Sequence, residues 1–328
     1  MTTVCAVVVT YNRKAILEHC LATLKAQTVR VTSIVVIDNG GWDGTREMLA
    51  AMDDDQLLIT SLDKNTGAAG GFNLGMRLAY ETAADFVWAM DDDVFPEPDA
   101  LEQLLNARDQ LESVGRRFPF LVSTARAPNG QLTEVPDIDR RPNKLGFPDW
   151  AALLEHGIVP VRGATFASIL IPRETLRDHG LPIAAMFIFG EDRDFTIRVT
   201  QDRPGFLIAK SRVIHARKLE GALDIRTEVD PIRLKYHYFL HRNTTATVLR
   251  FERLPHQLLH LWRQFTTSLY LVLSGRLGRA GVVAWGTFVG LRFRPAPEML
   301  TGCDSDHLSR SYRSAPHDAD SIPLRRAL

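Results

Sequence analysis

The chain has 328 residues, enough for two average domains or for one larger α/β unit. Hydrophobic residues make up 45% and charged residues 24%, which excludes collagen-like, wholly disordered and disulfide-scaffold chains. Lys and Arg number 39, as do Asp and Glu, and this balance argues against a chain that binds nucleic acid along its whole length. The charges are segregated, however. Residues 1–200 carry 19 basic and 28 acidic side chains, and residues 201–328 carry 20 and 11.

The cysteines and the apolar segments indicate the compartment. Cys5, Cys20 and Cys303 form no CxxC pair and no disulfide framework, so a reducing cytosol is expected. The early apolar run Val4–Val9 is too short for a signal peptide. No stretch approaches the roughly 20 apolar residues that a spanning helix needs. We therefore expect a cytoplasmic protein.

The first hundred residues alternate strand and helix patterns. Strands are predicted over residues 4–9, 33–37, 57–60 and 86–90, and helices over 14–27, 45–52, 71–84 and 99–111. This alternation predicts a parallel sheet covered by helices on both faces. Ligands of such sheets bind beyond the carboxyl ends of the strands. The segments that follow the four strands are therefore candidate site residues: 10–13, 38–40, 63–71 and 91–93.

The later pattern is less regular. Six prolines between residues 118 and 161 predict loops and short strands. A strand is then predicted over 165–171, and helices over 190–200, 230–250 and 256–273. We find no internal repeat.

Three aspartates directly follow the fourth predicted strand. In an extended chain residues i and i+2 point the same way, so Asp91 and Asp93 can converge while Asp92 points elsewhere. Clustered carboxylates repel one another unless a cation neutralises them, and their hard oxygen atoms suit Mg²⁺ or Mn²⁺. A solvated acidic turn is the alternative, of which Asp53–Asp55 is an example in this chain. The position at a strand's carboxyl end favours the metal site.

The chain resembles the family 2 glycosyltransferases, which have a GT-A fold. The matching segments come in family order over about residues 4–250: Val7-Val8-Val9-Thr10-Tyr11-Asn12-Arg13, Val36-Ile37-Asp38-Asn39, Asn65–Gly71, Asp91-Asp92-Asp93 and Gly190-Glu191-Asp192. The stretch Asn65–Phe72 and the three aspartates are most similar to the bacterial galactofuranosyltransferases, with rhamnosyltransferases close behind.

The resemblance implies an α/β, Rossmann-like, mostly parallel sheet flanked by helices, with a C-terminal helical extension. We expect a catalytic domain over residues 1–230, with a nucleotide-sugar half over about 1–115 and an acceptor half over about 116–230. A helical region over 231–294 and a polar, flexible tail over 295–328 would follow.

The resemblance also implies roles for the donor-site residues. A nucleotide-diphosphate sugar would be held by Thr10, Tyr11, Asn12, Arg13, Asp38, Asn65, Gly70, Gly71, Asp91 and Asp92. Asp38 would accept a hydrogen bond from the base. Mn²⁺ or Mg²⁺ would be held by Asp91 and Asp93, together with His215 at the end of a short strand pattern. A lone histidine is more often structural, which is the alternative for His215.

The second acidic pair supplies the candidate catalytic residues. Inverting sugar transfer needs a base for the acceptor hydroxyl, and the resemblance assigns this role to Asp192. Glu191 would orient the acceptor. A pair of acids that only favours a helix N-terminus is the alternative. On the later helix, Arg242 could reach a diphosphate, or it could belong to an aromatic stripe that faces the core.

The region from Arg253 to Arg294 has six arginines and no acid, and its helix 256–273 is amphipathic. This pattern predicts either a peripheral contact with the inner face of the plasma membrane or helices that pack on the catalytic domain. A polyprenyl-linked acceptor would make the membrane contact useful.

The favoured function is therefore inverting, metal-dependent transfer of galactofuranose from UDP-galactofuranose to a glycan or glycolipid hydroxyl. One alternative is a rhamnosyltransferase that uses dTDP-rhamnose, and another is a non-catalytic nucleotide-sugar sensor or membrane-surface scaffold. A Rossmann dehydrogenase and a nucleotidyltransferase both require a glycine-rich loop after the first strand, where Thr10–Arg13 stand instead.

Overall fold

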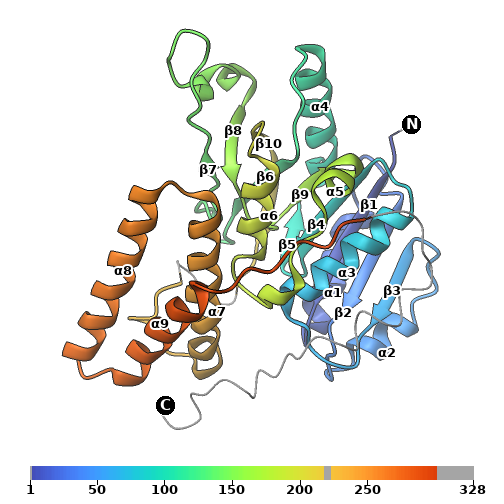
Figure 1. Cartoon of the computed structure of the whole chain (residues 1–328). Helices are drawn as coiled ribbons and strands as arrows, with labels where there is room; N and C mark the ends of the chain where they lie inside the picture. The colour runs from blue at the N-terminus through green and yellow to red at the C-terminus, as the bar shows by residue number, and fades with distance from the viewer. Residues whose placement is uncertain (1, 218–222, 301–328) are drawn as a thin grey trace.

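The computed structural model describes residues 2–217 and 223–300 (Figure 1). The strands are β1 (Val4–Thr10), β2 (Ser33–Asp38), β3 (Leu57–Ser61), β4 (Phe86–Asp91), β5 (Val94–Pro96), β6 (Leu121–Arg126), β7 (Asp137–Ile138), β8 (Ile158–Gly163), β9 (Ile169–Pro172) and β10 (Gly205–His215). The helices are α1 (Lys14–Lys25), α2 (Thr45–Ala50), α3 (Gly67–Glu81), α4 (Ala100–Ser113), α5 (Arg173–His179), α6 (Glu191–Val199), α7 (Pro231–Phe251), α8 (Leu254–Leu273) and α9 (Leu277–Gly290).

One sheet runs through the α/β part in the order β3-β2-β1-β4-β9-β6-β10-β8-β7, and β5 pairs with β10. The strands from β3 to β4 are parallel to one another, as are β6 and β10. β9 is antiparallel to both β4 and β6 and so joins the two parallel parts. The predicted parallel sheet is therefore confirmed in its first half, and the second half is mixed.

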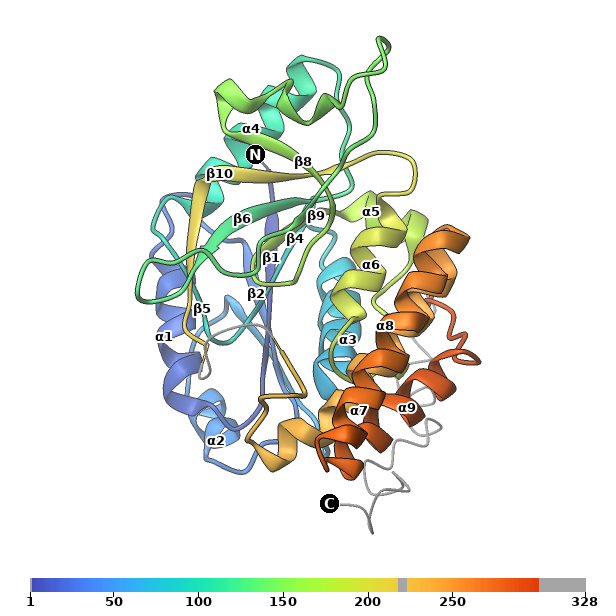
Figure 2. The same ribbon diagram turned by 90° about the vertical axis from the view of Figure 1, so that its left-hand side faces the viewer.

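Helices cover both faces of the sheet, as the alternation predicts. Val4, Ala6 and Val8 of β1 belong to a core that includes residues of α1, α2 and α4. The alternate residues of β1 belong to a second core with α3, α5 and α6. Figure 2 shows the two layers, with α1 and α2 on one side of the sheet and α3 and α6 on the other.

Some element boundaries differ from the predicted ones. α3 begins at Gly67 rather than at Gly71, because its glycines pack closely instead of forming a loop. A Cβ atom at Gly71 would lie 2.4 Å from Cγ1 of Val9 in β1. β9 begins at Ile169 rather than at Thr165. The short elements α5 and β5 were not predicted, since three to seven residues carry little periodicity.

The C-terminal helices pack on one another, and α7 contacts α6 of the α/β part. Asp230 caps α7 by accepting hydrogen bonds from the main chain of Ile232 and Arg233. None of the helices in the described residues is long and apolar enough to cross a membrane.

The chain after α9 returns to the α/β part. The Leu181 amide donates to the Glu298 carbonyl at 2.8 Å, and Arg77 of α3 pairs with the Glu298 carboxylate. Glu298 thus contacts the α/β part within the segment that was expected to be a flexible tail, and residues 301–328 of that segment lie outside the described residues.

Candidate functional site

The ends of β1 and β4 bring the first candidate residues together. The two strands are parallel neighbours, with Val9 beside Asp91. Thr10 Oγ1 therefore reaches Asp92 Oδ2, 2.6 Å away. Arg13 Nη1 donates to Asp92 Oδ1 at 2.9 Å and to Asp93 Oδ2 at 2.7 Å. Asp92 thus points toward Thr10 and Arg13, as the i and i+2 argument predicts, and both of its carboxylate oxygens have protein partners.

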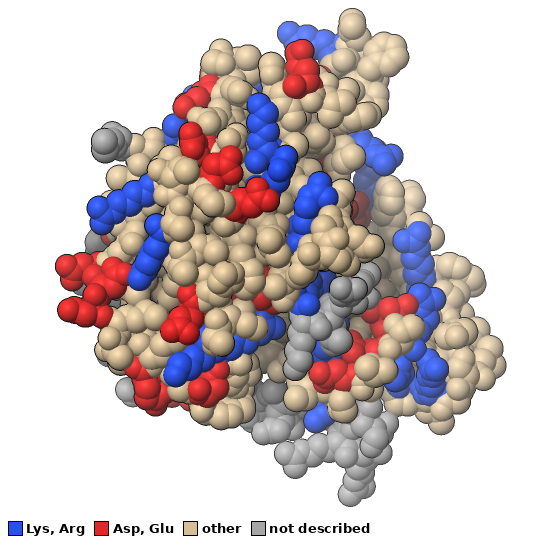
Figure 3. Space-filling model, turned by 180° about the vertical axis from the view of Figure 1, so that it is seen from behind, with Lys and Arg blue, Asp and Glu red and all other residues tan. Residues whose placement is uncertain are grey.

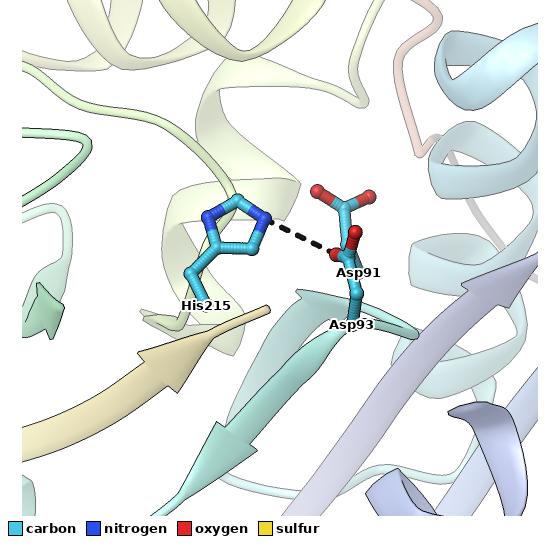
Figure 4. A group of neighbouring side chains, drawn as sticks. All are labelled: Asp91, Asp93 and His215. Atoms are coloured by element: carbon cyan, nitrogen blue, oxygen red, sulfur yellow. Dashed lines mark hydrogen bonds and ion pairs between the residues drawn. The ribbon is translucent and has the colours of Figure 1, made fainter. Parts of the chain in front are cut away.

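The carboxylates of Asp91 and Asp93 lie together with the imidazole of His215 (Figure 4). One ligand atom from each residue lies within 4.8 Å of the others. His215 Nε2 is 3.1 Å from Asp93 Oδ1. The register explains the arrangement, because β5 follows the aspartates directly and pairs its Val94 with His215 of β10.

The electrostatics of this cluster suit a cation. Burial and the charge of Asp93 raise the pKa of Asp91 to about 7. Burial also acts to raise the pKa of Asp93, but the hydrogen bond from His215 and the charge of Arg13 outweigh it and hold that pKa below its usual range. Two carboxylates and an imidazole are a donor set that can hold a divalent cation, whose charge would offset the repulsion.

A second group of residues surrounds the end of β2. Asp38 is fully buried, and its Oδ1 accepts a hydrogen bond from the Gly41 amide at 3.1 Å. Its Oδ2 is buried with no hydrogen-bond partner among the described residues. The rings of Tyr11 and Trp42 meet edge to face at 5.6 Å, and Trp42 is 78% exposed. Nε of Arg46 lies 3.8 Å from Oδ2 of Asp38, so this edge offers a carboxylate paired with an arginine and an exposed aromatic surface.

Asn39 connects this edge to the start of α3. Its Oδ1 accepts from the amide and the hydroxyl of Thr66 at 2.9 and 2.8 Å, and its Nδ2 donates to the Gly67 carbonyl at 2.9 Å. Asn65 Oδ1 accepts from the Gly67 amide at 2.7 Å. Asn39 lies in the predicted segment 38–40, but its contacts with the start of α3 were not predicted.

The predicted glycine positions have packing reasons of their own. A Cβ atom at Gly70 would lie 2.5 Å from Thr66 Oγ1, and Gly71 faces β1 as described above. Asn12 has φ +54°, and its Oδ1 accepts a hydrogen bond from the Trp42 amide at 2.7 Å. Contacts of these residues with a donor stay predictions.

The candidate base, Asp192, is the second residue of α6, whose N-cap Gly190 has φ +107°. Asp192 is half-buried, and its Oδ1 accepts the Arg193 amide at 2.6 Å. Burial raises the pKa of Asp192 to about 6. Glu191 is more deeply buried, and burial together with the charge of Asp192 raises its pKa well above the usual range. Asp192 is therefore the better proton acceptor of the two near neutral pH.

Glu134 was not predicted as a site residue. Its charge adds to the influences that raise the pKa of Asp192 and that of His215. Arg217 holds its carboxylate at 2.7 Å, and its backbone has φ +49°. It belongs to an irregular segment, which gave the sequence no periodic signal.

The family model named Glycosyl transferase family 2 matches residues 5–156. Residues 5–156 are therefore similar to the family 2 glycosyltransferases. The matched residues include β1, β2, the start of α3 and the three aspartates at the end of β4.

Curated relatives agree with this family. The galactofuranosyltransferase GlfT1 of Mycobacterium tuberculosis is 30% identical over 201 residues, which are 57% of this chain and 61% of that protein. GlfT1 of Mycolicibacterium smegmatis is 25% identical over 213 residues, 60% of this chain and 65% of that protein. The matched part thus spans less than two thirds of either relative.

Solved structures show the same fold. The structure of GalNAc-T7 with UDP, GalNAc and Mn²⁺ aligns with a TM-score of 0.55 and 14% identity over 76% of this chain and 48% of that chain. Residues 1–349 of S. aureus TarS in complex with UDP-GlcNAc align with a TM-score of 0.53 and 17% identity over 87% of this chain and 82% of that chain. The GT-A fold expected from the family 2 resemblance is therefore confirmed.

The guanidinium of Arg242, which was predicted to bind a diphosphate, makes its contacts with the protein itself. It is buried, and its Nη2 donates to the main-chain carbonyls of Ala185 and Met186 at 2.9 and 3.1 Å. Its guanidinium also lies 4.0 Å from the ring centre of Phe293. These contacts are made within the protein, and a direct contact with a diphosphate stays a prediction.

The pairing of Arg13 with the acidic strand end can be tested by stability. Arg13→Met leaves the buried carboxylates of Asp92 and Asp93 without that partner, so we expect the free energy of unfolding to fall by about 1–3 kcal/mol. Arg177→Met breaks an exposed pair with Asp178 and should cost less than about 1 kcal/mol. Urea denaturation of both variants measures the two changes in the free energy of unfolding. Equal losses would contradict a stabilising pairing of Arg13 with Asp92 and Asp93.

Proposed function

We propose that the protein is an inverting, metal-dependent glycosyltransferase that moves galactofuranose from UDP-galactofuranose to a hydroxyl of a glycan or polyprenyl-linked glycolipid. The observation that carries the proposal is the cluster of Asp91, Asp93 and His215, together with the half-buried Asp192 in the first turn of α6. The names of the curated relatives support the galactofuranosyl donor.

The chemistry follows from the placement of these groups. Asp192 takes the proton of the acceptor hydroxyl while the hydroxyl oxygen bonds to the anomeric carbon of the donor. The bond from that carbon to the diphosphate breaks, and UDP leaves with the electron pair. A divalent cation held by Asp91, Asp93 and His215 would neutralise the charge of the diphosphate.

The nucleotide half of the proposal rests on Asp38. Its buried Oδ2 has no hydrogen-bond partner among the described residues and pairs with Nε of Arg46 only at 3.8 Å, so it could accept the ring N–H of a pyrimidine base. Uracil and thymine both carry this N–H group, so Asp38 does not separate UDP-galactofuranose from dTDP-rhamnose. A rhamnosyltransferase is therefore the alternative enzyme. A non-catalytic sensor would need the same acceptor but no base, and the raised pKa of Asp192 favours the enzyme.

Asp192→Asn tests the base. We expect the transfer rate to fall by about 10²- to 10⁴-fold, because the amide cannot take the proton, while UDP affinity is unchanged. Release of UDP from UDP-galactofuranose in the presence of an alkyl galactofuranoside acceptor measures the rate, and Asp178→Asn is the exposed control. Near-normal turnover of Asp192→Asn would exclude the assignment.

The same residue predicts a pH profile. The pKa of Asp192 is raised to about 6, so its basic form is lost as the pH falls through 6. We expect kcat/KM of the wild-type enzyme to rise up to about pH 6 and then to level off.

Asp93→Ala tests the metal. Loss of one of the three ligand groups should weaken Mn²⁺-dependent UDP binding by at least about tenfold, which is 1.4 kcal/mol. Calorimetric titration with UDP, with and without Mn²⁺, gives the affinities, and Asp53→Ala in a separate acidic turn is the control. The same Mn²⁺-dependent affinity in Asp93→Ala and wild type would remove the metal role.

We also propose a peripheral contact between the helical region and the inner face of the plasma membrane. α8 buries Leu271 toward α9 but exposes a stripe on its outer side: Leu254, Leu258, Trp262, Phe265, Leu269 and Leu273. In helical spacing these residues share one face. Trp262 is 61% exposed, and nothing in the described residues covers the stripe.

The charges favour an anionic lipid surface as the occupant of this stripe. Residues 253–294 contain six arginines and no acid, so the region that carries the stripe is basic and suits an anionic lipid surface. Figure 3 shows basic side chains along the helical region and an uncharged surface at its outer margin. Trp, Phe and Leu beside arginines are typical of a helix that lies in a lipid interface.

Vesicle sedimentation tests this contact. We expect wild-type protein to bind phosphatidylglycerol vesicles more strongly than phosphatidylcholine vesicles, and Trp262→Ser with Phe265→Ser to reduce the bound fraction severalfold. The control is Leu145→Ser with Phe147→Ser, two exposed apolar residues of a distant loop. Equal vesicle binding by the two double variants would exclude the lipid contact. So would a wild-type protein that is dimeric in solution and becomes monomeric in the Trp262→Ser, Phe265→Ser variant.

A further inference from the structure

The segment before α6 has an unusual backbone. Phe187 and Phe189 have φ +64° and +63°, a region that non-glycine residues seldom occupy, and Gly190 has φ +107°. We call residues 185–190 the base loop, because Glu191 and Asp192 follow it directly. Strained backbone of this kind persists only where its surroundings hold it in place.

The surroundings that hold the base loop come from α7. Asn243 is fully buried, and its Nδ2 donates to three carbonyls of the loop: Met186 at 2.9 Å, Ile188 at 3.1 Å and Phe189 at 2.8 Å. The neighbouring Arg242 donates to Ala185 and Met186, and its Nε donates to Asn243 Oδ1 at 2.9 Å. Two adjacent side chains thus satisfy most of the loop's inward carbonyls.

α9 supports these side chains from behind. A Cβ atom at Gly290 would lie 2.6 Å from the Arg242 carbonyl, and one at Gly286 would lie 2.8 Å from the Tyr238 carbonyl. The two glycines therefore let α9 pack directly on the α7 backbone at the turn that carries Arg242 and Asn243. The helical region is in this way part of the environment of the base loop.

The other side of the base loop contacts the donor half. The Ala69 amide in the first turn of α3 donates to the Phe187 carbonyl at 2.9 Å. A Cβ atom at Gly67 would lie 2.0 Å from the same oxygen, so only glycine permits the contact. The loop is held between α3, whose start Asn39 secures, and the Arg242–Asn243 pair.

We infer that Arg242 and Asn243 are positioning residues that set the orientation of Asp192 through the base loop. This role rests on the proposed function of Asp192 as base. It gives the C-terminal helices a part in the reaction that is separate from any lipid contact. It also explains why Arg242 lies buried against carbonyls.

Asn243→Ala tests the role, with Thr247→Ala as the matched control. Thr247 is buried one turn further along α7, and its hydroxyl has no hydrogen-bond partner among the described residues. Both variants lose buried volume, but only Asn243→Ala releases the loop. We expect kcat to fall about 10- to 100-fold in Asn243→Ala, with donor KM and Mn²⁺-dependent UDP affinity within twofold of wild type. In Thr247→Ala all three should stay within twofold.

Hydrogen exchange separates this inference from the proposed function. We expect amides of residues 187–190 to exchange at least tenfold faster in Asn243→Ala but not in Thr247→Ala, whether or not the assay detects transfer. If Asn243→Ala loses kcat while its loop amides exchange at the wild-type rate, the inference is overturned. Equal losses of kcat in Asn243→Ala and Thr247→Ala would also overturn it. If Asn243→Ala does not fold, Arg242→Lys takes its place, because lysine cannot make the paired contacts with Asn243 and the loop carbonyls.

Discussion

The site depends on how the protein compensates the negative charge at the end of β4. Three consecutive carboxylates would destabilise a buried strand end if each stood alone. Thr10 and Arg13 satisfy Asp92 from the neighbouring strand end, and His215 approaches Asp93 from β10. Asp91 is left with a raised pKa and the fewest protein partners, which makes this corner suited to an added positive charge.

Contacts between distant segments also hold the base loop that precedes Asp192. The base loop lies between α3 and α7, so one short segment meets the donor half and the helical region. A change in α7 can therefore reach Asp192 without touching the nucleotide edge around Asp38. For this reason Asn243→Ala is expected to lower kcat while the affinity for UDP stays the same.

Much of the α/β architecture could be predicted from the sequence, because buried parallel strands are short apolar runs and their ends carry the polar residues. The convergence of Asp91 with Asp93 followed from strand geometry alone. The partner of that pair, His215, lies 122 residues further along, and only the resemblance pointed to it. The packing of Asn243 and the pairing of Glu134 with Arg217 depend on contacts between distant segments, which periodicity does not encode. Arg242 shows the converse problem, since a buried arginine and a ligand-binding arginine look alike in a sequence.

The return of the chain after α9 constrains how the molecule can move. The helical region is joined to the α/β part through α6 and α7 at one end and through the Glu298 contacts with Leu181 and Arg77 at the other. Arg242 and Asn243 of α7 also hold the base loop, so the helical region is attached to the α/β part at several places. Movement of the helical region against the sheet would have to break these contacts together, so we expect the two parts to move as one.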